Sequence, residues 1–246
     1  MEDSLLRRAE DLWSRCERTC TVTATAFLTP AEAMQLSGWA KQRGCRLLLT
    51  GGAKHTERKV GFFLPEWLEP EALDLSEEIR AVRITNRFGT LSHRDYLGAL
   101  LGLGVRREWL GDILVTEGAA TVLCLKSIEA HLLTLEQVGR WGVQCKSVPL
   151  TEVHPPERKV RPVSFTVQSA RLDAVTAGLF RLSRTAAAER IRVGDVSLNY
   201  EICQHTDAAV EPGDIVSLRG SGKAQLTEIG GQSRKGRIFL TGEIWL

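Results

Sequence analysis

The sequence predicts an α+β protein made of three small units. Stretches with helical and with strand periodicity alternate along all 246 residues, and 43% of these residues are hydrophobic, which is enough for more than one core. In the middle of the chain the stretches follow the order β-α-β-β-α-β, and a proline-rich segment then precedes a basic C-terminal part. We therefore expect an N-terminal α/β domain at residues 1–75, a ferredoxin-like middle domain at 76–152, a linker at 153–164 and a C-terminal domain at 165–246.

The N-terminal domain is expected to combine two helices with three strands. From residue 4 to 18 the apolar side chains recur at helical spacing: Leu5, Leu6, Ala9, Leu12, Trp13 and Cys16. TVTATAFL then has the composition of a strand, and Pro30 starts a second helix that Gly44 ends. Two further strands, CRLLLTGG and VGFFLP, enclose the polar loop AKHTERK.

The middle domain shows the clearest succession of elements. IRAVRITN is a predicted strand, and Ser92 with Asp95 three residues later predicts a capped helix, HRDYLGALLGLG. DILVTEG and ATVLCLK predict a hairpin, SIEAHLLTLEQVGR predicts an amphipathic helix over 127–140, and VQCKSVPL predicts the last strand. This order is the split β-α-β motif that ferredoxin-like and RNA-recognition-like domains share.

The strands of the middle domain lack the aromatic pairs on which RNA-recognition domains stack bases, and ATVLCLK has no Phe or Tyr. Any contact of this domain with RNA would therefore depend on shape, or on charge from Arg94, Arg106 and Arg107. A spacer or a protein-binding platform is the interpretation that this composition favours.

The C-terminal domain is expected to begin with two short helices. ARLDAVTAGLF predicts the first helix, and Ser183 is placed to cap a second one that starts near Arg184 or Thr185. Ala187 and Ile191 share one face of this second helix. Because alanine is small, the two helices can pack closely while the arginines remain outside.

A turn and a small sheet are predicted after these helices. Gly194 ends the second helix, and Val196, Leu198 and Tyr200 then alternate as a strand. IVSLRG follows the turn VEPGD as a further strand.

Charge is distributed unevenly, although the formal net charge is only +2. From Glu66 to Glu78 every charged residue is acidic. From 158 to 192 the chain has eight basic residues and only two acidic ones, Asp173 and Glu189. The basic residues are Arg158, Lys159, Arg161, Arg171, Arg181, Arg184, Arg190 and Arg192. Such a region is the footprint expected for binding a polyanion, and a solvated, salt-bridged surface is the alternative.

Several functional classes find no support in the sequence. No apolar run approaches the roughly 20 residues that span a bilayer, and the N-terminus is acidic where a secretory signal is basic. The six cysteines and five histidines are dispersed, which favours free thiols in a reducing cytoplasm over a metal or nucleophile site. RGSGKAQ lacks the spacing and the Ser or Thr of a phosphate-binding loop, and no GxGxxG follows a strand. We therefore expect no catalytic residue, metal or cofactor.

The C-terminal residues resemble the S4 RNA-binding domain. Its usual pattern is Arg-Leu-Asp, Ser-Arg, a small residue, Ile, a Gly turn, Val-x-Val-Asn and Pro-Gly-Asp. The matching residues are Arg171-Leu172-Asp173, Ser183-Arg184, Ala187, Ile191, Gly194, Val196-Ser197-Leu198-Asn199 and Pro212-Gly213-Asp214. Asp173 is expected to hold an arginine or to cap its helix.

The whole chain is similar to the YlmH family of bacterial S4-domain proteins. The segment LSHRDYLGALLGLGVRREWLGDI, the aromatic residue after Asn199 and the tail RGSGKAQLTEIGGQSRKGRIFL carry this resemblance. It implies the three-domain order given above and a role on the large ribosomal subunit in the rescue of stalled translation. The S4 domain would contact ribosomal RNA and tRNA.

Arginine side chains dominate the candidate RNA-binding residues, because a planar guanidinium can hold phosphate oxygens with two hydrogen bonds. Two features depart from the S4 pattern: Ala188 and Glu189 stand where many S4 helices are basic, and Arg190 stands where an apolar residue is frequent. We therefore rank Arg171 and Arg184 first. The full set is Arg171, Ser183, Arg184, Arg192, Asn199, Arg219, Lys223, Arg234, Lys235 and Arg190.

These observations predict a non-catalytic, cytoplasmic and monomeric protein that binds structured RNA, both ribosomal RNA and tRNA, without contacting a membrane. An RNA-modifying enzyme of the pseudouridine synthase or methyltransferase type, or an accessory subunit of one, is the alternative, since S4 domains are often fused to such enzymes. Arg171-Leu172-Asp173 mimics a synthase's catalytic triplet, but too few residues follow it for a separate catalytic domain. A protein-interaction adaptor, with an incidental basic surface, is a third alternative.

Overall fold

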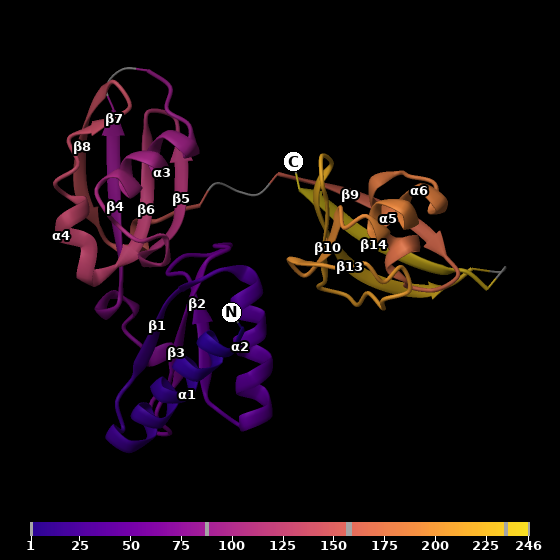
Figure 1. Cartoon of the computed structure of the whole chain (residues 1–246), viewed down its shortest axis with the longest axis horizontal. Coiled ribbons are helices and arrows are strands. Elements are labelled where there is room, and N and C mark those ends of the chain that lie inside the picture. The colour runs from indigo at the N-terminus through magenta and orange to yellow at the C-terminus, as the bar shows by residue number, and fades with distance from the viewer. Residues whose placement is uncertain (1, 87–88, 156–158, 234–235, 246) are drawn as a thin grey trace. The chain divides into compact units, whose positions relative to one another are not determined.

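The structure, a computed structural model, describes residues 2–86, 89–155, 159–233 and 236–245. The chain divides into two compact units, Met1–Pro156 and Glu157–Leu246 (Figure 1). Each unit has its own hydrophobic core.

The first unit begins with two helices packed on a three-stranded antiparallel sheet. The elements are α1 (Glu2–Thr19), β1 (Thr23–Leu28), α2 (Pro30–Arg43), β2 (Leu47–Thr50) and β3 (Lys59–Phe63), with strand order β1-β3-β2. Thr29 and Glu32 form a reciprocal capping box at α2, Pro30 occupies its first turn, and Gly44 ends it in the left-handed conformation. The helix starts and stops predicted from the sequence are therefore present.

The rest of the first unit is a five-stranded sheet with two helices. Its elements are β4 (Ile79–Asn86), α3 (His93–Gly102), β5 (Leu110–Thr116), β6 (Ala119–Leu125), α4 (Glu129–Leu132), β7 (Gln137–Val138) and β8 (Trp141–Val148). The strand order is β5-β6-β4-β8-β7. Short 3-10 helices lie at Pro70–Ala72, Leu75–Glu77, Arg107–Trp109, Lys126–Ile128 and Leu150–Glu152. The predicted Ser92–Asp95 capping box is formed at α3.

The helix predicted over 127–140 was wrong in length, because α4 has only four residues. The hydroxyl of Thr134 donates to the carbonyl of His131 (2.8 Å), an alternative to continuing the helix. Gly139 then turns the chain at φ +59°, so that Val138 pairs with Trp141 in a hairpin. Leu135 and Val138 are buried as helical spacing suggested, but a loop and a strand bury them instead.

The two halves of the first unit share a core. Val82 and Ile84 of β4 face α3 and α4, whereas Ile79 and Ala81 point to the opposite face of the sheet. There they pack with Phe27, Val60 and Phe62 of the N-terminal sheet. The boundary predicted at residue 75 therefore does not separate two compact units, and the N-terminal sheet covers part of the face on which RNA-recognition domains stack bases.

Polar contacts also join these halves. Asp112 of β5 accepts backbone hydrogen bonds from Glu57 (2.6 Å) and Arg58 (3.1 Å). The Arg58 side chain donates to the carbonyl oxygens of Leu110 (2.9 Å) and Phe27 (2.8 Å), and burial lowers the pKa of its guanidinium. These bonds satisfy buried polar groups and hold the two sheets together.

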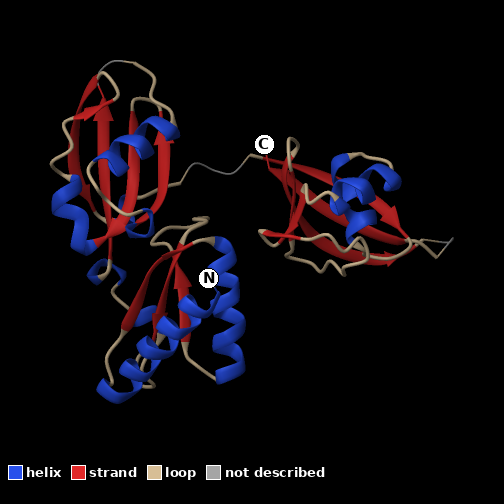
Figure 2. Cartoon of the chain, in the orientation of Figure 1, coloured by secondary structure: helices blue, strands red, loops and turns tan. Residues whose placement is uncertain are grey.

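The second unit packs two helices on one face of a six-stranded antiparallel sheet (Figure 2). Its elements are β9 (Val160–Val167), α5 (Leu172–Phe180), α6 (Arg184–Arg192), β10 (Val196–Leu198), β11 (Glu201–Ile202), β12 (Ile215–Leu218), β13 (Gly222–Gln232) and β14 (Ile238–Trp245). The strand order is β11-β10-β12-β13-β14-β9. Ala187 and Ile191 are fully buried, which confirms the predicted packing face of α6.

Two local predictions for this unit need correction. Residues 153–164 were predicted to be a linker because of their prolines and charges, but β9 already starts at Val160. At the other end of this segment, Val153 is buried in the core of the first unit. Pro162 is tolerated because β9 is an edge strand, where a backbone N–H is dispensable. Tyr200 does not continue β10 but lies in the turn after it, at φ +71°.

Gly178 allows β9 to approach α5 closely. A Cβ atom at this position would lie 2.1 Å from the ring of Phe165 on β9. Only glycine fits such a contact without moving the helix or the ring, so Gly178 shapes a groove beside α5.

Candidate nucleic-acid interface

Two arginines converge on one buried carboxylate at the start of α5. The Asp173 side chain is only 8% exposed. The Nε and Nη2 atoms of Arg184 both donate to its Oδ2 at 3.1 Å, and Nε of Arg171 donates to its Oδ1 at 3.4 Å. The expectation that Asp173 holds an arginine is thus met, with Arg184 as the closer partner.

The same arginines lie at the starts of both helices. Arg171 is the residue before α5, and Arg184 is the first residue of α6, with its side chain 52% exposed. The Ser183 hydroxyl accepts a hydrogen bond from the amide of Ala186 (3.1 Å), so Ser183 serves as the predicted helix cap. The helix start and the two guanidinium groups make this surface attractive to an anion.

A groove of about 330 Å³ lies between β9 and α5 and contains a third arginine. Arg184 and Arg237 both line it, together with Gln168 and Gly178. Nη2 of Arg237 donates to the carbonyl of Thr166 (2.5 Å), which fixes the side chain against β9. Arg237 is not among the RNA-binding residues predicted from the sequence, and its place beside Arg184 comes from the fold.

Arg190 and Arg219 form a second group around Asp195. Nε of Arg190 lies 2.7 Å from Oδ2 of Asp195, and its Nη2 donates to the carbonyl of Arg219 (2.6 Å). The Arg219 side chain is 85% exposed and is 3.8 Å from the same carboxylate. Arg190 therefore braces a loop, while Arg219 is presented to solvent; Arg192 is exposed at the end of α6.

The remaining candidates have different surroundings. The Asn199 amide bonds internally, donating to Asp214 (2.8 Å) and accepting from the amide of Ile215 (3.0 Å), so it stabilises a turn. Lys223 lies over two aromatic rings, those of Tyr200 and Trp245. Arg234 and Lys235 lie outside the described residues.

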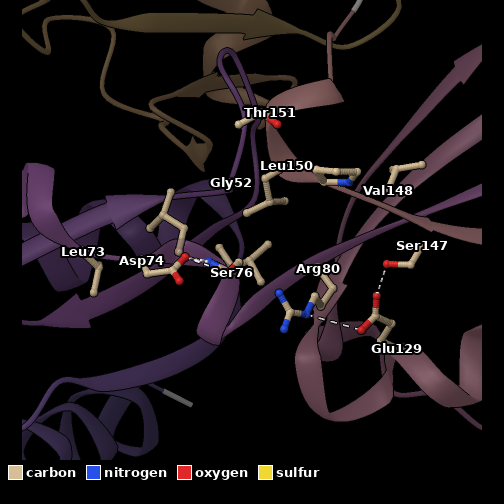
Figure 3. Close-up of a pocket in the computed structure, with 13 residues that line it drawn as sticks. Gly52, Leu73, Asp74, Ser76, Arg80, Glu129, Ser147, Val148, Leu150 and Thr151 are labelled. Carbon is tan, nitrogen blue, oxygen red and sulfur yellow. Dashed lines mark hydrogen bonds and ion pairs between the residues drawn. The ribbon is translucent and has the colours of Figure 1, made fainter.

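A larger cavity, of about 910 Å³, lies in the first unit (Figure 3). Arg80 and Glu129 form an ion pair there (3.4 Å), and the hydroxyl of Ser147 donates to Glu129 (2.5 Å). On its other side Asp74 accepts hydrogen bonds from Ser76, and these bonds hold the pKa of Asp74 below its ordinary value. The sequence carried no signal for this cavity, because its lining comes from segments far apart in the chain.

The described ranges contain no cluster of three His, Cys, Asp or Glu side chains suited to a metal ion. In the same ranges no helix is both long and apolar enough to cross a membrane.

Comparison with known proteins identifies the family. Residues 70–152 match a family model described as "Putative RNA-binding domain in YlmH". The chain is 33% identical over 220 residues, 89% of its own length and 86% of the relative's, to the "Ribosome-associated protein quality control protein P2" of Bacillus subtilis (strain 168). This chain belongs to the YlmH family.

A solved structure of the YlmH family has a related fold. The "Cell division protein ylmH" of Streptococcus pneumoniae matches 61% of this chain and 93% of its own chain, with a TM-score of 0.54 and 22% identity. The match in the family model covers most of the residues that line the 910 Å³ cavity, so the YlmH domain includes the Arg80–Glu129 pair.

Proposed function

We propose that this protein is a non-catalytic RNA-binding protein that acts on the ribosome, through an S4 domain formed by the second unit. The observation that carries the proposal is the pairing of Arg171 and Arg184 on the buried Asp173 carboxylate. This arrangement holds two positive groups side by side at the helix starts, where a sugar-phosphate backbone can approach.

Asp173 prepares Arg184 for this role. The carboxylate engages the Nε and Nη2 atoms of the guanidinium and so selects one side-chain rotamer. The Nη1 atom forms no hydrogen bond within the described residues and lies on the other edge of the same planar group. An arginine ordered in advance loses less conformational entropy when it binds phosphate.

The bound RNA is proposed to be ribosomal RNA and tRNA on the large subunit. The name of the Bacillus subtilis relative supports a place in ribosome-associated quality control. The description of the matched family supports a contribution from residues 70–152, where composition had favoured a spacer or a protein platform. We propose further that the protein is cytoplasmic and monomeric.

Sedimentation of cell lysate through a sucrose gradient tests this role. The protein should migrate with large ribosomal subunits at low salt and move to the top of the gradient after ribonuclease treatment. Recovery only in the top fractions, with or without ribonuclease, would contradict a ribosomal role.

The second unit should fold by itself and retain most of the RNA affinity. β9 pairs with β14 from Val160 to Val167, so the fragment should be 159–246; one that begins at 164 would lose half of this edge strand. Calorimetry and titration with a structured ribosomal RNA fragment would compare it with fragment 1–155. Tighter binding by 1–155 would move the main RNA site to the first unit.

Arg190→Ala should reduce RNA affinity less than Arg184→Ala. Arg190 holds Asp195 and the loop carbonyl of Arg219, so its loss should lower the free energy of unfolding by about 1 kcal/mol. Urea unfolding and RNA titration of the same variant measure both effects. A loss of affinity as large as that of Arg184→Ala would show that Arg190 contacts RNA directly.

A further inference from the structure

Tyr200 occupies a backbone position that suits glycine. Leu198 pairs with Glu201, so Asn199 and Tyr200 form the two-residue turn between β10 and β11. Both are left-handed, at φ +52° and +71°. Asparagine tolerates this conformation and glycine is preferred at the second position, whereas an aromatic side chain there is strained. Strain of this kind points to a function of the ring.

The rings of Tyr200 and Trp245 share one cationic neighbour, Lys223. Nζ of Lys223 is 5.1 Å from the ring centre of Tyr200 and 5.5 Å from that of Trp245. Lys223 is on β13 and Trp245 is on β14. Lys223 therefore links Tyr200 and Trp245, which are more than 40 positions apart in the chain. All three side chains are partly exposed.

This cluster lies on the face of the sheet opposite the core. Ala224 and Ile244 pair with each other and are buried against the helices, so the adjacent Lys223 and Trp245 point the other way. Ser217 pairs with Lys223 and with Ser197, which places two hydroxyl groups on the same face. Within the described part of the second unit, both helices belong to the core face.

We propose that Tyr200 and Trp245 form a binding site for an unpaired RNA nucleotide, distinct from the arginine surface of α5 and α6. The base stacks on an aromatic ring, and the Lys223 ammonium contacts the neighbouring phosphate. Aromatic rings on an open sheet face are the usual means of binding single-stranded RNA, because every base has a π-face. The inference rests on the proposed RNA-binding function and adds a substrate class to it: RNA with unpaired bases next to a structured region.

Lys223 gives the site its positive charge. Its ammonium group lies over the rings of both Tyr200 and Trp245. This ammonium group carries the positive charge that a phosphate requires. Glu243, which pairs with Gln225, is the acidic residue that β14 places on this face.

Tyr200→Gly separates a role of the ring from a role in folding. Glycine relieves the left-handed strain, so the melting temperature of the full chain should stay the same or rise. Fluorescence anisotropy with a labelled single-stranded RNA should show a loss of affinity of roughly 5- to 150-fold, the range for removal of one stacked base. Affinity for a fully paired RNA duplex should be unchanged, and Tyr200→Phe should bind both RNAs like the wild type.

The other outcomes are distinguishable. Wild-type affinity of Tyr200→Gly for single-stranded RNA overturns the site, while a loss of all RNA binding in Arg184→Ala would leave the proposed function standing. If Tyr200→Gly lost ribosome association but still bound single-stranded RNA like the wild type, the rings would contact a ribosomal protein instead of RNA. This result would also overturn the site. If the wild type bound neither RNA, the proposed function itself would fail.

Discussion

Replacing Arg184 by alanine should lower affinity for structured ribosomal RNA by roughly 10- to 150-fold. This range corresponds to about 1.5–3 kcal/mol, the contribution of a charge-assisted hydrogen bond. Arg184 starts α6, lines the groove with Arg237, and is held in place by Asp173. Titration of the full chain with a labelled RNA fragment measures the effect, and Arg171→Ala should follow closely.

The same change also affects stability, which the sequence did not suggest. Replacing an arginine that only faces solvent would change the free energy of unfolding by about 0.5 kcal/mol at most. Arg184 instead supplies the closest hydrogen bonds to a carboxylate that is 8% exposed, and Arg171 alone remains in the variant. We therefore expect a loss of about 1–2 kcal/mol, measured by urea unfolding.

Two further variants separate binding from folding. Arg184→Lys keeps the charge but loses the planar fork, so its affinity should lie between those of wild type and Arg184→Ala. In the Arg184→Ala background, Asp173→Asn removes a buried carboxylate that has lost its closest partner, and should recover part of the stability without recovering RNA affinity. Wild-type affinity in this double variant would mean that Arg184 does not contact RNA.

RNA affinity should fall steeply as salt concentration rises. If the basic residues of the second unit neutralise about five phosphates, a log-log plot of affinity against salt should have a slope of roughly −3 to −5. A fourfold rise in salt would then weaken binding by roughly 60- to 1000-fold. Anisotropy titrations at several salt concentrations measure the slope, which Arg184→Ala should reduce by about 1. A flat response would contradict binding to the RNA backbone.

Local signals in the sequence were sufficient for most elements and for part of the site. The capping box at Ser92 and the buried Ala187–Ile191 face depend on residues three or four positions apart. Interactions over this distance are formed within one helix, so composition and spacing predict them. The motif residues Arg171 and Asp173 could be recognised for the same reason, since both belong to one short segment.

Other features depended on tertiary structure. Leu132, Leu135 and Val138 have helical spacing. Val138 nevertheless lies in a strand, because the chain turns at Gly139 and pairs β7 with β8 in a hairpin. The strand β9 forms only because β14, about 80 residues later, offers its edge. The shared core of the first unit likewise combines β1 and β3 with β4, although the sequence predicted these strands to belong to different domains.

The sequence by itself determined which residues are basic, which helices they start, and to which family the chain is similar. Only the tertiary structure decided that Arg184 pairs with Asp173, that Arg237 lines the same groove as Arg184, and that Lys223 lies over both Tyr200 and Trp245. These neighbours come from different helices and strands. Their contacts are set by the packing of α5 on α6 and by the register of the sheet, and no local pattern of residues encodes either.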